Sequence, residues 1–490
     1  MDAAPPQLDR SGHPWADRLG AAFMRRDDRS DTGVRTPWSL DGGWTEARAR
    51  VWANTGHPFG GNDGVAWQGK GLTTALDLGA WARWGWLSVR AQPTVTVSQN
   101  AAFDLAPETP SGMPEVAYPW RRIDMPQRFG DGTVTTVHPG DSEIRLDARG
   151  VTLGLSSRNL WWGPGIHHSI LMSDNAPGIV HGFLGTRSPV DIWIGDLEAQ
   201  WVWGRLGQSD HYDPSVEDTD RFLTGLALTY QPAFVEGLHL GATRMFYGYV
   251  PEGGPELGDF FLVLQGVRKE GLATPDNPQG NDREDQMLSL FMRWVFPESG
   301  LELYGEWARN DHSWNFRDYF MEPEHSQGYV LGLRKATSLE DGRRLAVGAE
   351  MINLQRGRTT EVRPTPVFYA HHIVRQGYTN EGQAIGSNVG PGGNAQVITT
   401  ELYEDWGRAR LLLERRIHDN DAYYAFAEAN DLDFCCHHVG LSAGLEALVF
   451  AGPFDLGGGL TLTRELNRYF DRGNDVWNVN LSLSARWRPR

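Results

Sequence analysis

The last part of the chain, residues 477–487, alternates strictly between apolar and polar side chains. One face would carry Trp477, Val479, Leu481, Leu483, Ala485 and Trp487, and the other Asn478, Asn480, Ser482, Ser484 and Arg486. About ten residues of this period, ending on an aromatic side chain, are typical of the final strand of an outer-membrane β-barrel. A single strand of this kind also fits a soluble β-sandwich, whose core would hide the apolar row.

The same alternation recurs along the chain and predicts an all-β fold. The expected strands are Thr73–Trp84, Gly85–Ser98, Ile144–Leu146, Val151–Leu155, Phe222–Tyr230, Leu238–Phe246, Leu288–Phe296, Leu301–Trp307, Tyr329–Arg334, Leu345–Leu354, Arg408–Arg416, Tyr423–Ala429, Val439–Val449 and Leu456–Thr463. Short turns join several of them into hairpins, among them Asp147-Ala-Arg-Gly. With less distinct segments we expect a transmembrane antiparallel barrel of about 16 to 18 strands.

Long polar segments separate the hairpins. They are Asn100–Asp141, Gly207–Asp220, Gly248–Asp259, Lys269–Asp285, Asn310–Gln327 and Arg356–Glu401. Short turns at one end and long loops at the other match the periplasmic and extracellular ends of a barrel. We therefore expect one barrel over residues 41–490, with no linker that divides it.

The segment before the barrel, residues 1–40, contains the one clear helical pattern. Trp15, Leu19, Ala22 and Phe23 recur at helical spacing, which predicts a short periplasmic helix over Pro14–Asp27. A frayed leader segment is the alternative. The start, Met1-Asp-Ala-Ala-Pro-Pro, lacks the basic and apolar regions of a signal peptide. Because an outer-membrane protein must be exported, we expect a mature chain preceded by an added Met.

Composition narrows the class of protein. The mean hydropathy is −0.44 and no stretch approaches the roughly 18 apolar residues of a membrane helix, which excludes a helical membrane protein. The 58 Gly, 20 Trp and 20 Phe suit turns and membrane interfaces, although a soluble glycan-binding or propeller protein is also rich in Trp and Gly. A net charge of −17 disfavours nucleic acid as a partner. The adjacent Cys435 and Cys436 imply no disulfide framework.

The densest segment for chemistry is Ser156–Gly178, which contains Trp161, Trp162 and Asn175 around a Gly-Pro-Gly turn. Indole rings stack on the C–H faces of sugars, and amide side chains bind their hydroxyls. The alternative places both Trp residues in the interfacial aromatic girdle and Asn175 in a turn. From residue types alone the girdle interpretation is favoured.

Two stretches resemble the signature of the Wzi-type capsule assembly proteins. The first runs from Asn159-Leu-Trp-Trp-Gly-Pro-Gly through Ile170-Leu-Met-Ser-Asp-Asn-Ala-Pro-Gly, with Asp174 where the family has Asn. The second is Tyr369-Ala-His-His-Ile-Val-Arg-Gln-Gly-Tyr-Thr-Asn-Glu-Gly-Gln-Ala-Ile-Gly386, followed by Asn388 and Gly390-Pro-Gly-Gly-Asn394. The family's larger N-terminal helical bundle has no clear counterpart in this chain.

The resemblance implies an outer-membrane barrel of about 18 strands that acts as a non-catalytic lectin and holds capsular polysaccharide or exopolysaccharide at the cell surface. Residue chemistry nominates as tentative contacts Trp161, Trp162, Asn175, His372, Arg375, Tyr378 and Asn380. Because Tyr378 lies on a long polar segment, we expect folding to depend on it less than on the two Trp residues. The expected partners are this polysaccharide and outer-membrane lipid, and we expect a monomer.

Other chemistry finds little support. Glu302 and Glu306 would lie about 13 Å apart along one strand, farther than the roughly 5 to 9.5 Å of glycosidase carboxylate pairs. In a strand, Cys435-Cys-His-His438 would place its members on opposite faces, so we expect no metal there. No Gly-x-Ser-x-Gly nucleophile turn with a credible triad occurs, and we expect no catalytic residue and no cofactor. A porin for small solutes and an outer-membrane hydrolase stay open as alternatives. The large inward side chains expected at Arg293, Tyr304 and Arg486 favour a plugged lumen over a porin.

Overall fold

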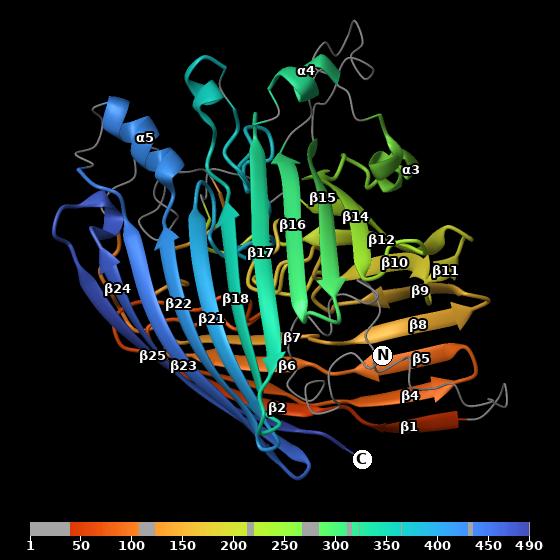
Figure 1. The fold of residues 1–490 in the computed structure, drawn as a ribbon. Helices are drawn as coiled ribbons and strands as arrows, with labels where there is room; N and C mark the ends of the chain where they lie inside the picture. Colours follow the sequence, from red (N-terminus) through yellow and green to blue (C-terminus); the bar gives the residue numbers. More distant parts are fainter. Residues whose placement is uncertain are drawn as a thin grey trace, which may run out of the picture.

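One antiparallel sheet closes on itself into a barrel in the computed structural model of the chain (Figure 1). The structure describes residues 40–106, 123–212, 220–266, 284–310, 316–322, 324–363, 365–429 and 435–489. The helix expected at 14–27 lies outside the described residues. The division of the chain at residue 40 therefore stays a prediction.

The first half of the sheet contains β1 (Leu40–Trp44), β2 (Ala47–Asn54), β3 (Gly71–Asp77), β4 (Ala80–Trp84), β5 (Leu87–Ala91), β6 (Thr94–Ser98), β7 (Val134–His138), β8 (Glu143–Ala148), β9 (Val151–Ser156), β10 (His181–Thr186), β11 (Val190–Asp191), β12 (Gly195–Leu206) and β13 (Arg221–Pro232). The second half contains β14 (Leu238–Tyr249), β15 (Glu284–Phe296), β16 (Leu301–Asn310), β17 (Gln327–Ser338), β18 (Arg344–Asn353), β21 (Asn394–Glu404), β22 (Gly407–Ile417), β23 (Val439–Ala451), β24 (Phe454–Leu466) and β25 (Val476–Trp487). A separate small sheet pairs β19 (Thr379–Asn380) with β20 (Gln383–Ala384).

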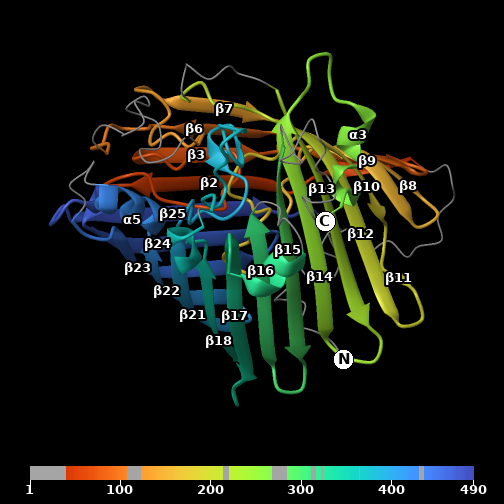
Figure 2. The ribbon, with the colours of Figure 1, turned by 90° about the horizontal axis from the view of Figure 1, so that it is seen from above.

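Five pairs of consecutive segments continue one another and share their neighbours in the sheet: β1 with β2, β3 with β4, β5 with β6, β7 with β8, and β10 with β11. Within the described residues, the 23 segments of the sheet therefore make eighteen barrel strands, which lies within the expected range. β25 pairs with β2, and Trp487 lies opposite Ala47, which closes the barrel. Figure 2 follows this wall through β6, β3, β2, β25 and β24.

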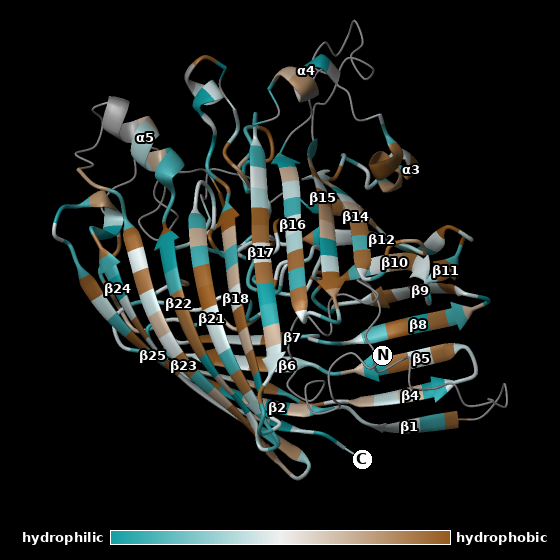
Figure 3. Cartoon of the chain, in the orientation of Figure 1, coloured by the Kyte–Doolittle hydropathy of each residue, from teal (hydrophilic) through white to brown (hydrophobic). Residues whose placement is uncertain are grey.

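The barrel is apolar outside and polar inside. On β25, Trp477 is 54% exposed and Leu483 is 53% exposed, whereas Asn478 between them is fully buried. Brown and teal bands alternate along the strands in Figure 3. This arrangement is inverted relative to a soluble sandwich, and it suits a sheet whose outer face meets lipid.

Connections differ sharply between the two ends. At one end, short turns join the strands; Arg149 and Gly150 both have positive φ, as a two-residue type I′ hairpin requires. The other end carries the long loops with α3 (Leu257–Phe260), α4 (Phe316–Met321) and α5 (Asn420–Ala429) (Figure 1). The 3₁₀ turns η2 (Leu262–Leu264), η4 (Arg358–Glu361) and η5 (Arg468–Phe470) also lie between strands. None of the described helices combines the length and apolar character needed to span a membrane.

Several local expectations were wrong. The strand expected at Tyr423–Ala429 is helix α5, which begins where Asp419 Oδ1 accepts a 3.0 Å hydrogen bond from Ala422 N–H. Asp419 is therefore the N-cap of the helix, a signal that the alternation of apolar and polar residues does not contain. The segment expected as a loop at Asn100–Asp141 contains β7, and the one expected at Arg356–Glu401 contains most of β21.

Candidate functional site

Two loops fold into the barrel and fill its lumen. They are 157–180, between β9 and β10, and 354–393, between β18 and β21. Their apolar side chains, including Ile170, Leu171, Tyr369 and Tyr378, join the inward side chains of the strands in one buried cluster. Of the three inward side chains expected to favour a plugged lumen, Arg293 and Tyr304 are buried and Arg486 is half-buried.

A buried carboxylate anchors the first loop to the wall. Glu350, on β18, accepts hydrogen bonds from the backbone N–H groups of Ile166 (2.6 Å), His167 (3.1 Å) and His168 (2.8 Å). The Tyr304 hydroxyl donates to the same carboxylate over 2.9 Å. Four donors converge on one buried side chain, so Glu350 holds the turn of the loop at a fixed depth.

The two segments that carry the sequence signature bind each other inside the barrel. Tyr369 donates its hydroxyl proton to the carbonyl oxygen of Ile170 (2.7 Å), and Tyr378 donates to that of Leu171 (2.8 Å). In return, the Asn175 side-chain amide donates to Ala384 O over 2.8 Å. The signature therefore describes, at least in part, the interlock of two plug loops.

The residues nominated as sugar contacts occupy different environments. Trp162 is 1% exposed and donates from Nε1 to Gln200 Oε1 (3.2 Å), and Trp161 donates to Gly165 O (3.1 Å). Both indoles lie inside the barrel, so the girdle alternative does not describe them. Asn380 is buried and donates to Pro177 O (3.1 Å). A direct contact of these side chains with polysaccharide stays a prediction.

The nominated residues of the second loop also differ among themselves. Tyr378, expected on a long polar loop, is fully buried, so its replacement is expected to destabilise the barrel. Its ring packs beside those of Tyr247 and Tyr369, with centroids 5.0 and 5.9 Å away. His372 is exposed and lies against His371, whereas Arg375 is half-buried and donates its backbone N–H to the Tyr249 hydroxyl (3.1 Å).

A cavity of about 330 Å³ opens among the long loops, within the size range of small-molecule sites. Its aromatic lining consists of Phe59, Trp67, Phe103 and Tyr469. Its polar and charged lining includes His57, Asp63, Gln68, Gln127, Asn175, Gln383, Asn388, Glu414, Arg416, His418, His438, Glu465 and Arg468. Of the seven nominated residues, Asn175 lines this cavity.

The rim of the cavity between β24 and β25 is held in an unusual backbone conformation. Asn467, Tyr469 and Phe470 all have φ between 50° and 63°, a left-handed region that is rare for aromatic residues. The Arg468 guanidinium lies over the Tyr469 ring, 4.5 Å from its centroid, and Tyr469 donates its hydroxyl proton to Asp104 O (2.8 Å). Strain of this kind persists where the surroundings fix a functional geometry.

Burial shifts the titration of two groups on the cavity wall. It raises the pKa of the Asp63 carboxyl to about 6, against the opposing charge of Arg50 and hydrogen bonds from Gly61 N–H and Gln68 Nε2. Burial also lowers the pKa of His57. The cavity therefore presents a neutral imidazole at neutral pH.

Two histidines and a glutamate from three separate segments form a cluster on the cavity wall. His418 follows β22, His438 precedes β23 and Glu465 lies near the end of β24, and their ligand atoms all lie within 4.8 Å of one another. Burial and the neighbouring His418 lower the pKa of His438 to about 4, so its imidazole is neutral. Sequence spacing within Cys435–His438 gives no sign of this group, because three segments far apart in the sequence bring its members together.

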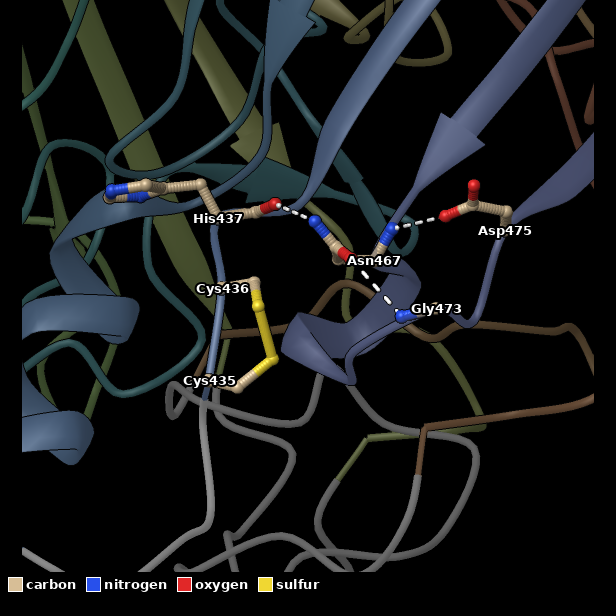
Figure 4. Close-up of a disulfide and its surroundings, with 6 residues drawn as sticks. All are labelled: Cys435, Cys436, His437, Asn467, Gly473 and Asp475. Atoms are coloured by element: carbon tan, nitrogen blue, oxygen red, sulfur yellow. Dashed lines mark hydrogen bonds between the residues drawn. A yellow bond between two sulfur atoms is a disulfide. The ribbon is translucent and has the colours of Figure 1, made fainter.

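Cys435 and Cys436 form a disulfide between neighbouring residues, where the sequence had suggested no framework (Figure 4). Beside it, the Asn467 side-chain amide donates to His437 O (3.3 Å), and Asn467 Oδ1 accepts from Gly473 N–H (3.2 Å). These contacts tie the segment before β23 to the loop after β24. They therefore hold His438 next to Glu465.

Comparison with solved structures finds an outer-membrane β-barrel of similar fold. The E. coli outer-membrane protein Wzi, described as a carbohydrate-binding β-barrel involved in group 1 capsule assembly, matches with a TM-score of 0.59 and 14% identity, over 90% of this chain and 84% of that chain. Pseudomonas putida OprB matches at 0.40 and 10% identity (94% and 96% covered), and Pseudomonas aeruginosa OpdQ at 0.43 and 12% identity (91% and 97% covered). No curated protein sequence matches the chain.

The family comparison agrees with the signature segments. The model of the family described as capsule assembly protein Wzi matches residues 53–409, which include both plug loops and the cavity walls at Phe59, Trp67 and Gln383. The barrel with its apolar outer face is an outer-membrane protein fold. On this match, which covers most of its length, the chain belongs to the Wzi family of capsule assembly proteins.

Proposed function

We propose that the protein binds capsular or extracellular polysaccharide at the cell surface, without catalysis, and that the cavity among the long loops receives one or two of its sugar units. The single observation that supports this proposal most is the lining of that cavity. Four aromatic rings share it with several amide and charged side chains. Aromatic faces stack on sugar C–H groups, and amides and guanidinium groups bind hydroxyls and carboxylates.

The position of the cavity also supports the proposal. It lies at the end of the barrel that carries the long loops, which is the extracellular end in barrels of this kind. A polymer outside the cell could reach it from that end of the barrel. In this account, the buried Trp161, Trp162, Tyr378 and Asn380 support the cavity through the plug, while Asn175 contacts the ligand directly.

The two alternatives are less well supported. A diffusion porin needs an open lumen, whereas the plug loops fill this one with apolar side chains. A hydrolase built on Glu302 and Glu306 needs carboxylates that are free to react. Glu302 is paired with Arg293 Nε at 2.6 Å, and Glu306 is buried beneath the first plug loop.

The test is binding of purified barrel in detergent to the extracellular polysaccharide of the producing bacterium. Trp67→Ala removes a stacking face and should weaken binding about five-fold, since one aromatic contact contributes about 1 kcal/mol. Gln383→Ala should also weaken it, because the Gln383 side chain makes no hydrogen bond within the described part of the chain and is free for a ligand.

The matched control is Trp193→Ala. Trp193 is 96% exposed in the turn between β11 and β12, at the opposite end of the barrel. This variant should bind like the wild type. If Trp67→Ala and Gln383→Ala both bind polysaccharide as the wild type does while their barrels are folded, the cavity is not the binding site.

A further inference from the structure

The three side chains His418, His438 and Glu465 converge on one point of the cavity wall. His438 Nε2 lies 3.2 Å from Glu465 Oε2, and His418 Nε2 lies 3.2 Å from the same oxygen. The two imidazole rings stack with centroids 4.2 Å apart. One carboxylate oxygen therefore faces two imidazole nitrogens of the same type.

A hydrogen bond accounts for one of the two nitrogen–oxygen contacts, the one between His438 and Glu465. His438 Nε2 is aligned for a hydrogen bond with Glu465 Oε2. His418 Nε2 is equally close, but it is buried and makes no aligned hydrogen bond within the described residues. This nitrogen lies at ion-pair distance from the Glu465 carboxylate without an aligned hydrogen bond, a position that a ligand atom sharing a metal ion with that carboxylate would also occupy.

The distances fit a small metal ion. For metal–nitrogen and metal–oxygen bonds of about 2.0 to 2.1 Å in a tetrahedral site, two ligand atoms lie about 3.3 Å apart. Both nitrogen–oxygen separations match this value, and the nitrogens lie within 4.8 Å of each other. We propose that His418, His438 and Glu465 bind a divalent transition-metal ion of the zinc class, with one coordination position open to the cavity.

His57 provides an independent observation at the same cavity. Its Nδ1 lies 2.9 Å from Pro58 O, and since a carbonyl oxygen only accepts, Nδ1 carries the proton. The lone pair is then on Nε2, which is buried and has no hydrogen-bond partner among the described residues. An imidazole fixed by a backbone carbonyl in this way is the usual form of a metal-binding histidine. His57 is thus available to a ligand in the cavity, directly or through water.

The ligand types decide between classes of ion. Two imidazoles and one carboxylate suit zinc and its neighbours in the first transition row, whereas calcium and magnesium prefer oxygen ligands throughout. Three protein ligands and an open position are also typical of zinc sites that receive a further ligand.

The experiment uses the full-length barrel in detergent, purified without a polyhistidine tag, treated with EDTA and titrated with ZnCl₂ in a calorimeter under non-reducing conditions. The wild type should take up one Zn²⁺ per chain, and CaCl₂ should give no saturable binding. Loss of a ligand should weaken Zn²⁺ binding by more than about 100-fold, since loss of an outer partner alone weakens it about 10- to 100-fold. The variants are His418→Ala and Glu465→Gln; His418 is the safer one for folding because its side chain is 30% exposed.

Two controls separate this site from its neighbours. His437→Ala removes an imidazole that bonds to Asn420 instead, and the double variant Cys435→Ser, Cys436→Ser removes both sulfur atoms. Both should bind Zn²⁺ like the wild type. Absence of Zn²⁺ binding to the wild type, unchanged binding in folded His418→Ala, or loss of binding in a folded His437→Ala or cysteine variant would each overturn the proposal. No polysaccharide is present, so the result is independent of the proposed function.

Discussion

The Tyr378 hydroxyl donates a 2.8 Å hydrogen bond to the carbonyl oxygen of Leu171, which joins two loops that are 207 residues apart in sequence. Both residues are fully buried inside the barrel. An outer-membrane barrel can close its lumen in this way without a separate domain. The loops that close it also form part of the walls of the outer cavity, through Asn175 and Gln383.

Replacement of Tyr378 tests this interlock. Tyr378→Phe leaves Leu171 O without its donor and should lower the free energy of unfolding by about 1 to 2 kcal/mol. Tyr378→Ala also creates a cavity and should lower it by about 3 to 5 kcal/mol. Thermal unfolding of the purified barrel, followed by circular dichroism, measures both. Equal midpoints for Tyr378→Ala and the wild type would show that the interlock does not stabilise the fold.

Removal of the plug anchor should change the permeability of the barrel. Glu350→Ala deletes the acceptor of three backbone N–H groups and of the Tyr304 hydroxyl, so the first plug loop should loosen. In planar lipid bilayers the wild type should conduct little, and Glu350→Ala should show larger and more frequent openings. Asp341→Ala, in an exposed short turn, is the control. A wild type that conducts as a wide open pore would contradict a plugged lumen.

The strand pairing predicts that the end of the chain is essential for assembly. Deletion of residues 478–490 removes nearly all of β25 and leaves the edges of β2 and β24 unpaired in lipid, where each open backbone group costs several kcal/mol. Folded protein in the outer membrane should fall to background, as judged by fractionation and protease resistance. Normal levels of the folded deletion variant would show that β25 does not close the barrel.

Asp63 should make the free energy of unfolding of the barrel depend on pH. Because its pKa is about 6 in the folded barrel and near 3.8 otherwise, the folded state holds the proton more tightly. The contribution of protonated Asp63 to the stability of the folded barrel is fully present below about pH 4 and is lost as pH rises through about 6. The groups that face this carboxyl are Arg50 and Asp174.

The variant Asp63→Asn cannot lose a proton, so it isolates this effect. Its stability relative to the wild type should increase by about 1 kcal/mol between about pH 4.5 and pH 8, since one pKa unit corresponds to about 1.4 kcal/mol and the side chain is partly exposed. Thermal midpoints of both proteins across this range provide the measurement. A difference that stays constant with pH would refute the raised pKa.

The sequence predicted the barrel well because its main determinant is local. Alternation on β25 separates Trp477 and Leu483 from Asn478 without reference to any distant residue, and the same holds for most strands. Helix α5 was misassigned because the alternation of Tyr423–Ala429 is short, and the capping role of Asp419 was overlooked. In short segments of this kind, capping residues at the ends decide the secondary structure more than the alternation of apolar and polar residues does.

The site was less predictable, for a physical reason. Trp162 and Tyr378 have the chemistry of sugar-binding residues, but the same aromatic and polar character serves a buried interlock equally well. Trp67, Gln383 and Tyr469 meet at the cavity only because three loops far apart in sequence return to one end of the barrel. The local pattern of apolar and polar residues does not show which distant loops come together in the fold.

In the proposed function, the outer cavity holds polysaccharide on the cell. The most direct measurement is the ratio of cell-bound to released polysaccharide in the producing bacterium, with the chromosomal copy replaced by the wild type, Trp67→Ala with Gln383→Ala, or Trp193→Ala. The double cavity variant should release most of its polysaccharide into the medium at normal levels of folded barrel, while Trp193→Ala retains it. Full retention by the folded double variant would show that the outer cavity does not hold the polysaccharide.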